Sequence, residues 1–514
     1  MKERFIKIYD TTLRDGAQTP GLTLTTGNKL KIAQKLADLG FHYIEGGWPG
    51  ANPTDSEFFK RIKQEVDLNN STLAAFGMTG RIGIKAEDDE GLQTLLNSQT
   101  GLITIFGKSW MDHVKYALKT TGTKNLDTIF RTVEFLRKSG RDVFYDAEHF
   151  FDGYKSNPNY ALEAIRAAKM GGARVVILCD TNGGSIPEFI YKTTKHVKEA
   201  FPKLPLGIHV HNDGGLANVN TLAAVQAGAS QVQGTVNGVG ERAGNVDLCI
   251  FMPTAEFKYG FKTGIDLTRI NELSDYVAKH NGFPVPTNAP YRKGSLTHKG
   301  GVHVSAQERG ATYEHIDPRL VGISSHFEHS DQGGGANIIS MAQKHGLKLD
   351  KGDPKVKILV DKMKQKQILG DAQELLLLNE VLCLKDIEFT VLPSSKTETS
   401  KIEGAKALID VSIEGKIFHA QASGNGGLNA YDIALRAALS EKYPEVFEIK
   451  LVDYRVVLPP LEELGTDALV EVYVELSADG NNWTSRTRNV DQQLASQDAL
   501  VEGYQYFLLK NAHE

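Results

Sequence analysis

The chain has 514 residues, of which 41% are apolar and 24% are charged, as expected of a folded globular protein with two or three domains. Its net charge of −5 excludes a strongly basic surface, so neither nucleic acid nor a membrane is expected as a partner. The longest apolar runs are far too short to span a bilayer. Three cysteines without a C-x-x-C pair, and an N-terminus without a signal-peptide pattern, predict a cytoplasmic protein.

The first half of the chain alternates β-rich runs with amphipathic stretches of helical period. In the stretch NKLKIAQKLADLG, for example, Leu30, Ala33 and Leu36 recur at helical spacing, and Gly40 follows where a helix would end. Eight β-rich runs alternating with helices predict an α/β protein with a (β/α)₈ barrel, or TIM barrel, rather than a doubly wound sheet. The expected strands are residues 5–9, 43–46, 72–76, 102–106, 142–145, 174–179, 206–210 and 231–236.

The pattern of elements changes twice along the chain, which predicts three regions. Residues 1–264 are expected to form the barrel, and residues 265–384 are predicted to form a helical linker region punctuated by glycines. Residues 385–514 repeat a pattern of three strands and a helix, which predicts an α+β domain of two βββα units. In its segment SGNGGLNAYD, a glycine-rich turn enters a helix; this is either an anion site for an amino-acid carboxylate or a plain N-cap turn.

A candidate metal site is formed by residues at the C-terminal ends of the predicted strands, which meet at one mouth of a barrel. His209 and His211 are two residues apart on the seventh strand, so their side chains point to the same side. Asp15 follows the first strand and would add a carboxylate, while Asn245 follows the eighth and would add a carbonyl oxygen. This donor set suits Mg²⁺, Mn²⁺ or Zn²⁺ and leaves two octahedral positions for a 2-oxo acid. A histidine pair of this spacing is, by itself, as often a polar strand end.

Further polar residues fall at the same predicted mouth. Arg14 precedes Asp15, Glu45 ends the second strand, and Glu148 lies near the end of the fifth. Taken singly, Arg14 with Asp15 is more often a surface ion pair, and Glu148 a solvated carboxylate. Their common position at one end of one barrel favours a catalytic site.

Four segments resemble the signature segments of the DRE-type metal-dependent barrel enzymes: IYDTTLRDGAQTPG, IHVHNDGG, NGVGERAGN and THKGGVHVSA. Within these enzymes, the whole chain is similar to the acyltransferase family of 2-isopropylmalate, homocitrate and citramalate synthases. The segment YIEGGWPGANPTD resembles one group of citramalate synthases more than the leucine-pathway enzymes. Ala17 departs from the glutamate that many leucine-pathway enzymes carry at this position.

The resemblance implies a role for each candidate residue. The residues that match metal ligands are Asp15, His209, His211 and Asn245. The residues that match substrate-binding positions are Arg14, Asp15, Glu45 and Thr181. The residues that match catalytic positions are Arg14, Glu148, His303 and Tyr313. His303 is expected as the base that deprotonates acetyl-CoA, brought by the linker across a dimer interface; the alternative is a structural histidine in a glycine-rich loop.

The family implies an acyltransferase that condenses acetyl-CoA with pyruvate and hydrolyses the thioester to (R)-citramalate and CoA. The C-terminal domain would then be a regulatory module of a homodimer that binds a branched-chain amino acid, isoleucine. Bulky residues expected at the pocket wall favour pyruvate: Phe76, Met78, Phe106, Phe144 and Asp146. The alternatives are a 2-isopropylmalate synthase that accepts 2-oxoisovalerate, a homocitrate synthase, a lyase of the same barrel type and a non-catalytic amino-acid sensor.

Overall fold

The structure is a computed structural model, and it describes residues 4–298, 314–323, 326–327, 334–350, 352–365, 370–384, 389–400, 404–458 and 468–511. The chain forms two compact units, each of which is described by itself. One unit comprises Met1–Leu296 and Glu314–Ser325, and the other comprises Thr297–Tyr313 and His326–Glu514. No described helix has the length and apolarity needed to cross a membrane.

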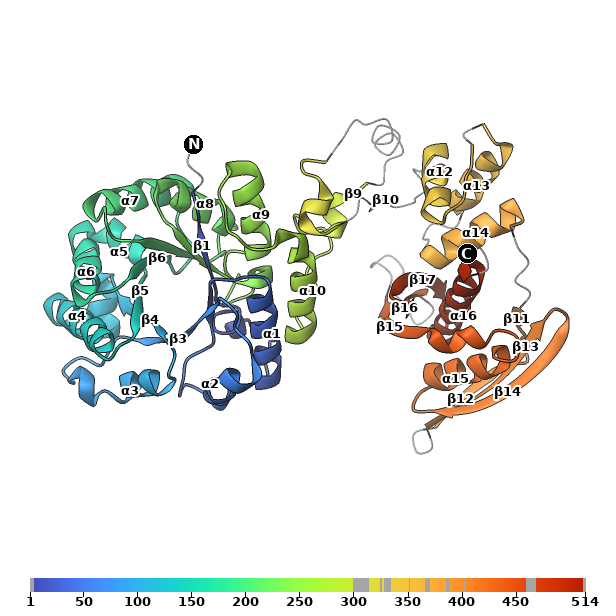
Figure 1. The fold of residues 1–514 in the computed structure, drawn as a ribbon, viewed down its shortest axis with the longest axis horizontal. Helices are drawn as coiled ribbons and strands as arrows, with labels where there is room; N and C mark the ends of the chain where they lie inside the picture. The colour runs from blue at the N-terminus through green and yellow to red at the C-terminus, as the bar shows by residue number, and fades with distance from the viewer. Residues whose placement is uncertain are drawn as a thin grey trace. The chain divides into compact units, whose positions relative to one another are not determined.

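The first unit is a closed barrel of eight parallel strands, as predicted (Figure 1). Each strand pairs with the next, and β8 returns to β1 with Lys7 beside Gln231, which closes the sheet. The strands are β1 (Lys7–Asp10), β2 (Tyr43–Glu45), β3 (Thr72–Met78), β4 (Leu102–Lys108), β5 (Asp142–Glu148), β6 (Val175–Asp180), β7 (Leu206–Val210) and β8 (Gln231–Gly234). They lie within a few residues of the expected runs.

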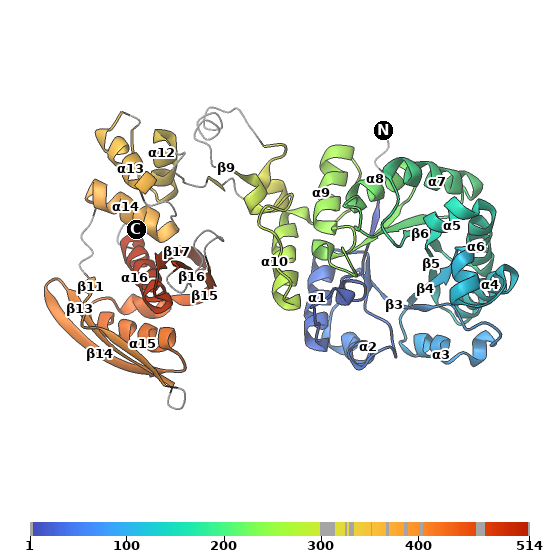
Figure 2. The ribbon, with the colours of Figure 1, turned by 180° about the vertical axis from the view of Figure 1, so that it is seen from behind.

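A ring of helices surrounds the barrel, as the views from both sides show (Figures 1 and 2). Local signals set their ends: the backbone N–H of Asn28 donates to the Thr25 hydroxyl at the start of α1, and Gly172 at φ 100° ends α6. The helices are α1 (Thr26–Asp38), α2 (Pro53–Glu65), α3 (Glu90–Asn97), α4 (Gly122–Lys138), α5 (Phe150–Ser156), α6 (Pro158–Gly171), α7 (Pro187–Ala200), α8 (Ala217–Ala227), α9 (Leu248–Tyr259) and α10 (Ile270–Asn281).

The alternation of side chains along each strand separates two cores. Outward-facing residues such as Ile8, Ile44 and Ile103 pack under the helices, and residues of α10 join the same core. Inward-facing residues form an apolar layer inside the barrel that consists of Tyr9, Ala74, Leu102, Phe144, Ile177 and Cys179. The next inward positions toward the C-terminal ends of the strands include the buried polar residues Glu45, Asp146, His209 and Gln233. The fold therefore concentrates polar chemistry at the mouth.

Among its described residues, the second unit has a group of three helices and two antiparallel sheets, each of which packs with a helix of its own. The helices α12 (Gly335–Lys344), α13 (Pro354–Gln365) and α14 (Asp371–Leu382) share a small apolar core, and α14 also joins the core of the sheets. The linker region also holds two strands that were not predicted, β9 (Thr297–His298) and β10 (His326–Phe327). The predicted division of the chain at residues 264 and 384 stays a prediction.

The two βββα units of the α+β domain are present, with one change in the first. Two strands are present where one was expected before β13: a short β11 and a polar β12 pair with opposite ends of β13 along one edge. The elements of the first βββα unit are β11 (Phe389–Val391), β12 (Lys396–Ser400), β13 (Gly404–Ile413), β14 (Lys416–Gly424) and α15 (Gly427–Leu439). Those of the second are β15 (Lys450–Val457), β16 (Val470–Ala478), β17 (Asn481–Asn489) and α16 (Gln492–Asn511).

Candidate active site at the barrel mouth

Eight of the ten predicted site residues lie at the C-terminal ends of the barrel strands or in the loops that follow them. They come from the loop after β1, the ends of β2, β5 and β7, and the loops after β6 and β8. His303 and Tyr313 lie outside the described residues, so their positions stay predictions.

Asp15, His209 and His211 form a compact buried group. The Nε2 atoms of His209 and His211 lie 4.0 Å and 3.9 Å from Oδ2 of Asp15. One donor atom from each residue lies within 4.8 Å of the others, and all three residues are buried. These distances are too long for hydrogen bonds, but two ligands of one metal ion, each about 2.1 Å from it, lie up to about 4.2 Å apart. The two distances to Asp15 fit a shared divalent ion.

Asn245 completes this group. A β-bridge pairs His211 with Asn245, and the side-chain nitrogen of Asn245 donates to Oδ1 of Asp15 over 2.7 Å. Oδ1 of Asn245 is buried and has no hydrogen-bond partner in the part of the chain that the structure describes. A buried oxygen without a partner is costly, and a metal ion would satisfy it. The glycine at position 240, with φ 157°, leaves space for the Asn245 side chain, because a Cβ there would lie 2.1 Å from Asn245 Nδ2.

The charges of the donor set suit a divalent cation. Burial, and then the neighbouring His211, lower the pKa of His209 to about 3, and burial also lowers the pKa of His211. Burial alone would raise the pKa of Asp15, but the surrounding groups, first among them the Arg14 guanidinium, outweigh it and lower this pKa. At neutral pH the group therefore offers two neutral imidazoles and one carboxylate, which is the protonation state that metal binding requires.

Arg14 is held rigidly beside this group. Its Nε donates to Oε2 of Glu45 over 2.6 Å, and its Nη1 donates to Oδ2 of Asp15 over 2.8 Å. The guanidinium carbon lies 3.8 Å from the ring centre of Phe76. Glu45 is fully buried and also accepts from the hydroxyls of Tyr9 and Thr11, over 2.6 and 2.5 Å. Burial lowers the pKa of Arg14, but Glu45 and Asp15 more than reverse this, so the guanidinium stays charged.

An aromatic wall flanks Arg14. The rings of Phe76 and Phe106 stack with centres 5.5 Å apart, and Trp48 meets both edge-on at 5.9 and 5.8 Å. We define the aromatic wall as Trp48, Phe76 and Phe106. It contains two of the five residues predicted to shape the pocket, and Trp48 was missed because it lies in the loop after β2.

The prediction that Phe144 lines the pocket is wrong. Phe144 faces inward one layer too deep: its ring packs 5.1 Å from that of Tyr43, and it lines a cavity of about 350 Å³ with Lys7 and Gln231, which pair at the opposite end of the strands. Met78 is 37% exposed and lines a hollow over the loops after β2 and β3 together with Trp48 of the aromatic wall, so its place in the pocket stays a prediction. Phe144 is therefore a residue of the barrel floor.

Asp146 lies at the level of Glu45 in the barrel interior. It is 4% exposed, and Nε2 of Gln233 donates to its Oδ1 over 3.0 Å. Burial, and next the charge of Glu45, raise its pKa to about 8. Gln233 was missed, although its place two residues after Gln231 on the last strand marks an inward-facing pair.

Glu148 is the last residue of β5, and Thr181 directly follows β6. The carboxylate of Glu148 forms an ion pair with Lys108 at the end of β4. The hydroxyl of Thr181 accepts a hydrogen bond from the backbone N–H of His149 over 2.8 Å. Lys108 was missed in the sequence, because a lysine at a strand end is usually solvated.

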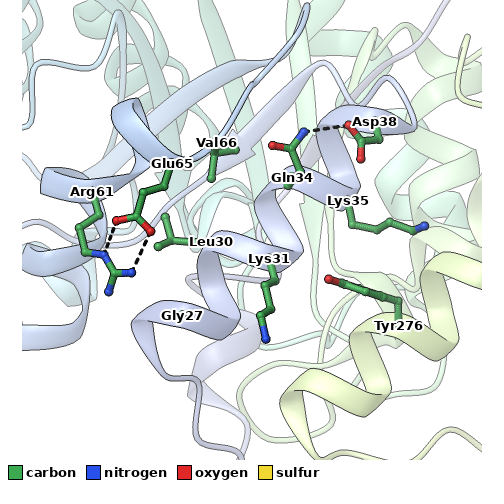
Figure 3. Close-up of a pocket in the computed structure, with 10 residues that line it drawn as sticks. All are labelled: Gly27, Leu30, Lys31, Gln34, Lys35, Asp38, Arg61, Glu65, Val66 and Tyr276. Atoms are coloured by element: carbon green, nitrogen blue, oxygen red, sulfur yellow. Dashed lines mark hydrogen bonds and ion pairs between the residues drawn. The ribbon is translucent and has the colours of Figure 1, made fainter.

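A second hollow, of about 520 Å³, lies on the outside of the barrel between helices α1, α2 and α10 (Figure 3). Its lining is mostly charged and polar, and Arg61 pairs there with Glu65 within α2. None of the predicted site residues lines it. The candidate site therefore lies at the mouth and not in this groove.

Comparisons with known proteins agree with the motifs in the sequence. A model of the HMGL-like family matches residues 5–277, and a model of the LeuA allosteric (dimerisation) domain matches residues 370–508. The chain is 43% identical to the (R)-citramalate synthase of Aquifex aeolicus, with 99% of both chains covered. It is 40% identical to that of Geobacter sulfurreducens, with 98% of both chains covered.

Similarity to a leucine-pathway enzyme is lower. The chain is 32% identical to the 2-isopropylmalate synthase of Pyrococcus furiosus, with 97% of this chain and 98% of that protein covered. The family predicted from the signature segments is therefore confirmed. The chain belongs to the HMGL-like family and, within it, stands with the (R)-citramalate synthases.

Proposed function

We propose that the chain condenses acetyl-CoA with pyruvate and releases (R)-citramalate and CoA, as an acyltransferase of isoleucine biosynthesis. The methyl carbon of acetyl-CoA loses a proton and bonds to the ketone carbon of pyruvate. The ketone oxygen takes up a proton, and water then cleaves the thioester. The observation that carries this reaction class is the buried group of Asp15, His209 and His211 beside the fixed guanidinium of Arg14.

Four residues would hold a divalent metal ion at the mouth: Asp15, His209, His211 and Asn245. Mg²⁺, Mn²⁺ and Zn²⁺ all accept this donor set. When bound, the ion supplies Lewis-acid polarisation of a ketone oxygen. Arg14 donates to the same oxygen as negative charge grows there, and Glu45 keeps the guanidinium in place, so no reorganisation is needed during the reaction.

The remaining roles follow the sequence resemblance. Thr181 is assigned to the carboxylate of pyruvate. His303, supported by Glu148 and Tyr313, is assigned to removal of the methyl proton of acetyl-CoA, and the linker of a second copy in a homodimer would supply it. His303 and Tyr313 enter the proposal from the sequence alone.

Two observations favour pyruvate over 2-oxoisovalerate. The identity to (R)-citramalate synthases reaches 43%, against 32% for the 2-isopropylmalate synthase of Pyrococcus furiosus. The aromatic wall beside Arg14 also leaves less room for an isopropyl group than for a methyl group. Each methylene group is worth about 1–3 kcal/mol of discrimination, so the preference is expected to be clear but finite.

The C-terminal domain is assigned to feedback control. Its match to the LeuA allosteric (dimerisation) domain supports a homodimer, and isoleucine is the effector expected if citramalate is the product. Inhibition by isoleucine, but not by leucine, together with a dimer mass by light scattering, is the expected result. Leucine as the stronger inhibitor would move the protein to the leucine pathway. A cytoplasmic location stays a prediction.

Product identification tests the proposed function. The chain is incubated with Mn²⁺, acetyl-CoA and pyruvate, and the product is separated on a chiral column and weighed by mass spectrometry. We expect (R)-citramalate. Amino-acid binding without any turnover by the metal-loaded protein would instead indicate a non-catalytic sensor.

A further inference from the structure

A cation that the motifs did not single out lies next to the carboxylate assigned to proton transfer. Lys108 and Glu148 are register partners at the last positions of β4 and β5, and both continue the inward-facing series of their strands. Their side chains form an ion pair and are only 18% and 22% exposed. In the part of the chain that the structure describes, this is the one cation paired with Glu148.

The backbone at both ends of this pair is anchored. The side-chain nitrogen of Asn125, which is 1% exposed, donates to the carbonyl of Lys108 over 2.8 Å. The same nitrogen donates to the hydroxyl of Tyr160, also over 2.8 Å. The hydroxyl of Ser109 donates to the carbonyl of Glu148 over 2.7 Å. The two side chains therefore start from fixed points and meet across one strand pair.

Lys108 also connects this pair to the rest of the mouth. Its ammonium group lies 5.6 Å from the ring centre of Phe106, which stacks on Phe76. The ring of Phe76 in turn packs against the guanidinium of Arg14. The aromatic wall thus supports the group that binds the ketone oxygen at one end and the partner of Glu148 at the other.

We propose that Lys108 is a positioning residue, which holds the carboxylate of Glu148 in the place from which it assists removal of the acetyl-CoA methyl proton. This inference rests on the proposed function. A glutamate side chain alone samples many rotamers, and an ion pair shielded from water keeps one of them. Proton transfer at carbon depends steeply on such placement, because a shift of about 1 Å costs about 100-fold in rate. Lys108 acts through Glu148 and does not itself touch the substrate.

The experiment compares Lys108→Met, Lys108→Arg, Glu148→Gln and the double variant Lys108→Met with Glu148→Gln. The readout is pyruvate-dependent thiol release, with kcat and KM for each substrate, in protein loaded with Mn²⁺. Lys138→Met is the matched control, since Lys138 pairs with Glu134 on the exposed face of α4. Circular dichroism and metal content establish that each variant is folded and loaded.

We expect kcat of Lys108→Met to fall by about 10- to 100-fold, with KM for pyruvate changed less than about 2-fold. Lys108→Arg, which keeps the charge and the ion pair, recovers most of this loss. The double variant is no slower than Glu148→Gln, because Lys108 has no effect once its carboxylate partner is gone. Lys138→Met matches the unaltered chain.

Three results would overturn the inference. One is a Lys108→Met variant with unchanged kcat. Another is a double variant whose losses multiply, which would make Lys108 a substrate-binding group. The third applies if Lys108→Met does not fold: a Lys108→Arg variant whose kcat is as low as that of Glu148→Gln would also overturn the inference. Absence of turnover in the unaltered chain would overturn the proposed function as well, whereas normal turnover there confines the failure to Lys108.

Discussion

The side-chain nitrogen of Asn245 donates to Asp15 over 2.7 Å, while its oxygen has no hydrogen-bond partner among the described residues. The β-bridge between His211 and Asn245 brings the loop after β8 against the end of β7. This hydrogen bond and the β-bridge together link ligand candidates from three parts of the chain. The arrangement has the donors of a metal site already in place.

Replacing His211 with alanine should remove metal binding and turnover together. One of two imidazoles is lost, and the ligands that remain cannot hold the ion in position. We expect turnover to fall more than about 100-fold and bound metal, measured by plasma mass spectrometry, to drop in parallel.

His419→Ala serves as the control for that experiment, since His419 is 73% exposed and pairs with Asp410 in the sheet of β13 and β14. It should leave both metal content and turnover unchanged. A His211→Ala variant that keeps its metal and its activity would show that the buried group is not a metal site.

Arg14→Lys should lower kcat by about 100- to 1,000-fold with little change in the KM for acetyl-CoA. Lysine keeps the charge, but it cannot donate to Glu45 and Asp15 at once or lie flat on Phe76. Steady-state kinetics provide the measurement, with Arg166→Lys on α6 as the control for an exposed ion pair. Activity within about 2-fold of the unaltered chain would remove Arg14 from the mechanism.

Phe106→Ala should widen the acceptor pocket. We expect the ratio of kcat/KM for 2-oxoisovalerate to that for pyruvate to rise at least about 10-fold, because an aromatic side chain of the wall is removed. Phe447→Ala is the control, as Phe447 is 61% exposed and belongs to the second unit rather than to the barrel. An unchanged ratio would mean that the aromatic wall does not contact the acceptor.

The barrel was predictable because its signals are local and repeated. The β-rich runs between stretches of helical period located all eight strands within a few residues. In the second unit, β12 was missed because its sequence, KTETS, contains only polar residues and resembles a loop. Its pairing with β13, the next strand along the chain, makes it a strand, and the polar sequence of β12 gives no sign of that pairing.

The candidate site was predictable where chemistry coincides with a strand end, as for Asp15 and His209. Depth along a strand was not predictable: Phe144 and Asp146 share a face, yet the first lies on the floor and the second at the level of Glu45. Cross-strand partners were also hidden. Lys108 acquires meaning only from its register with Glu148, which sequence patterns do not give.

The barrel should lose stability as the pH falls toward 5. His42 accepts a hydrogen bond at Nδ1 from the backbone N–H of Ile8 over 3.1 Å, so it is neutral in the fold. Burial, and then the charge of Lys7, lower its pKa to about 4, below the value of about 6.5 in an unfolded chain. Between pH 6.5 and 4 the unfolded chain therefore binds more protons than the folded chain, and the free energy of unfolding decreases as the pH is lowered.

Urea unfolding followed by tryptophan fluorescence at pH 7 and pH 5 measures this effect. His42 is partly solvated, so we expect it to account for about 1 kcal/mol of the loss. In the His42→Gln variant, the glutamine side chain can accept the same hydrogen bond but does not titrate. The free energy of unfolding of this variant should therefore fall by about 1 kcal/mol less between pH 7 and pH 5. Equal losses in the two proteins would contradict the role of His42.

Thiol release from acetyl-CoA, measured in metal-loaded protein with pyruvate, 2-oxoisovalerate, 2-oxobutyrate and 2-oxoglutarate in turn, tests the central claim most directly. The account predicts the highest kcat/KM with pyruvate, at least about 10-fold above 2-oxoisovalerate. A preference for 2-oxoisovalerate, or no thiol release with any acceptor, would contradict it.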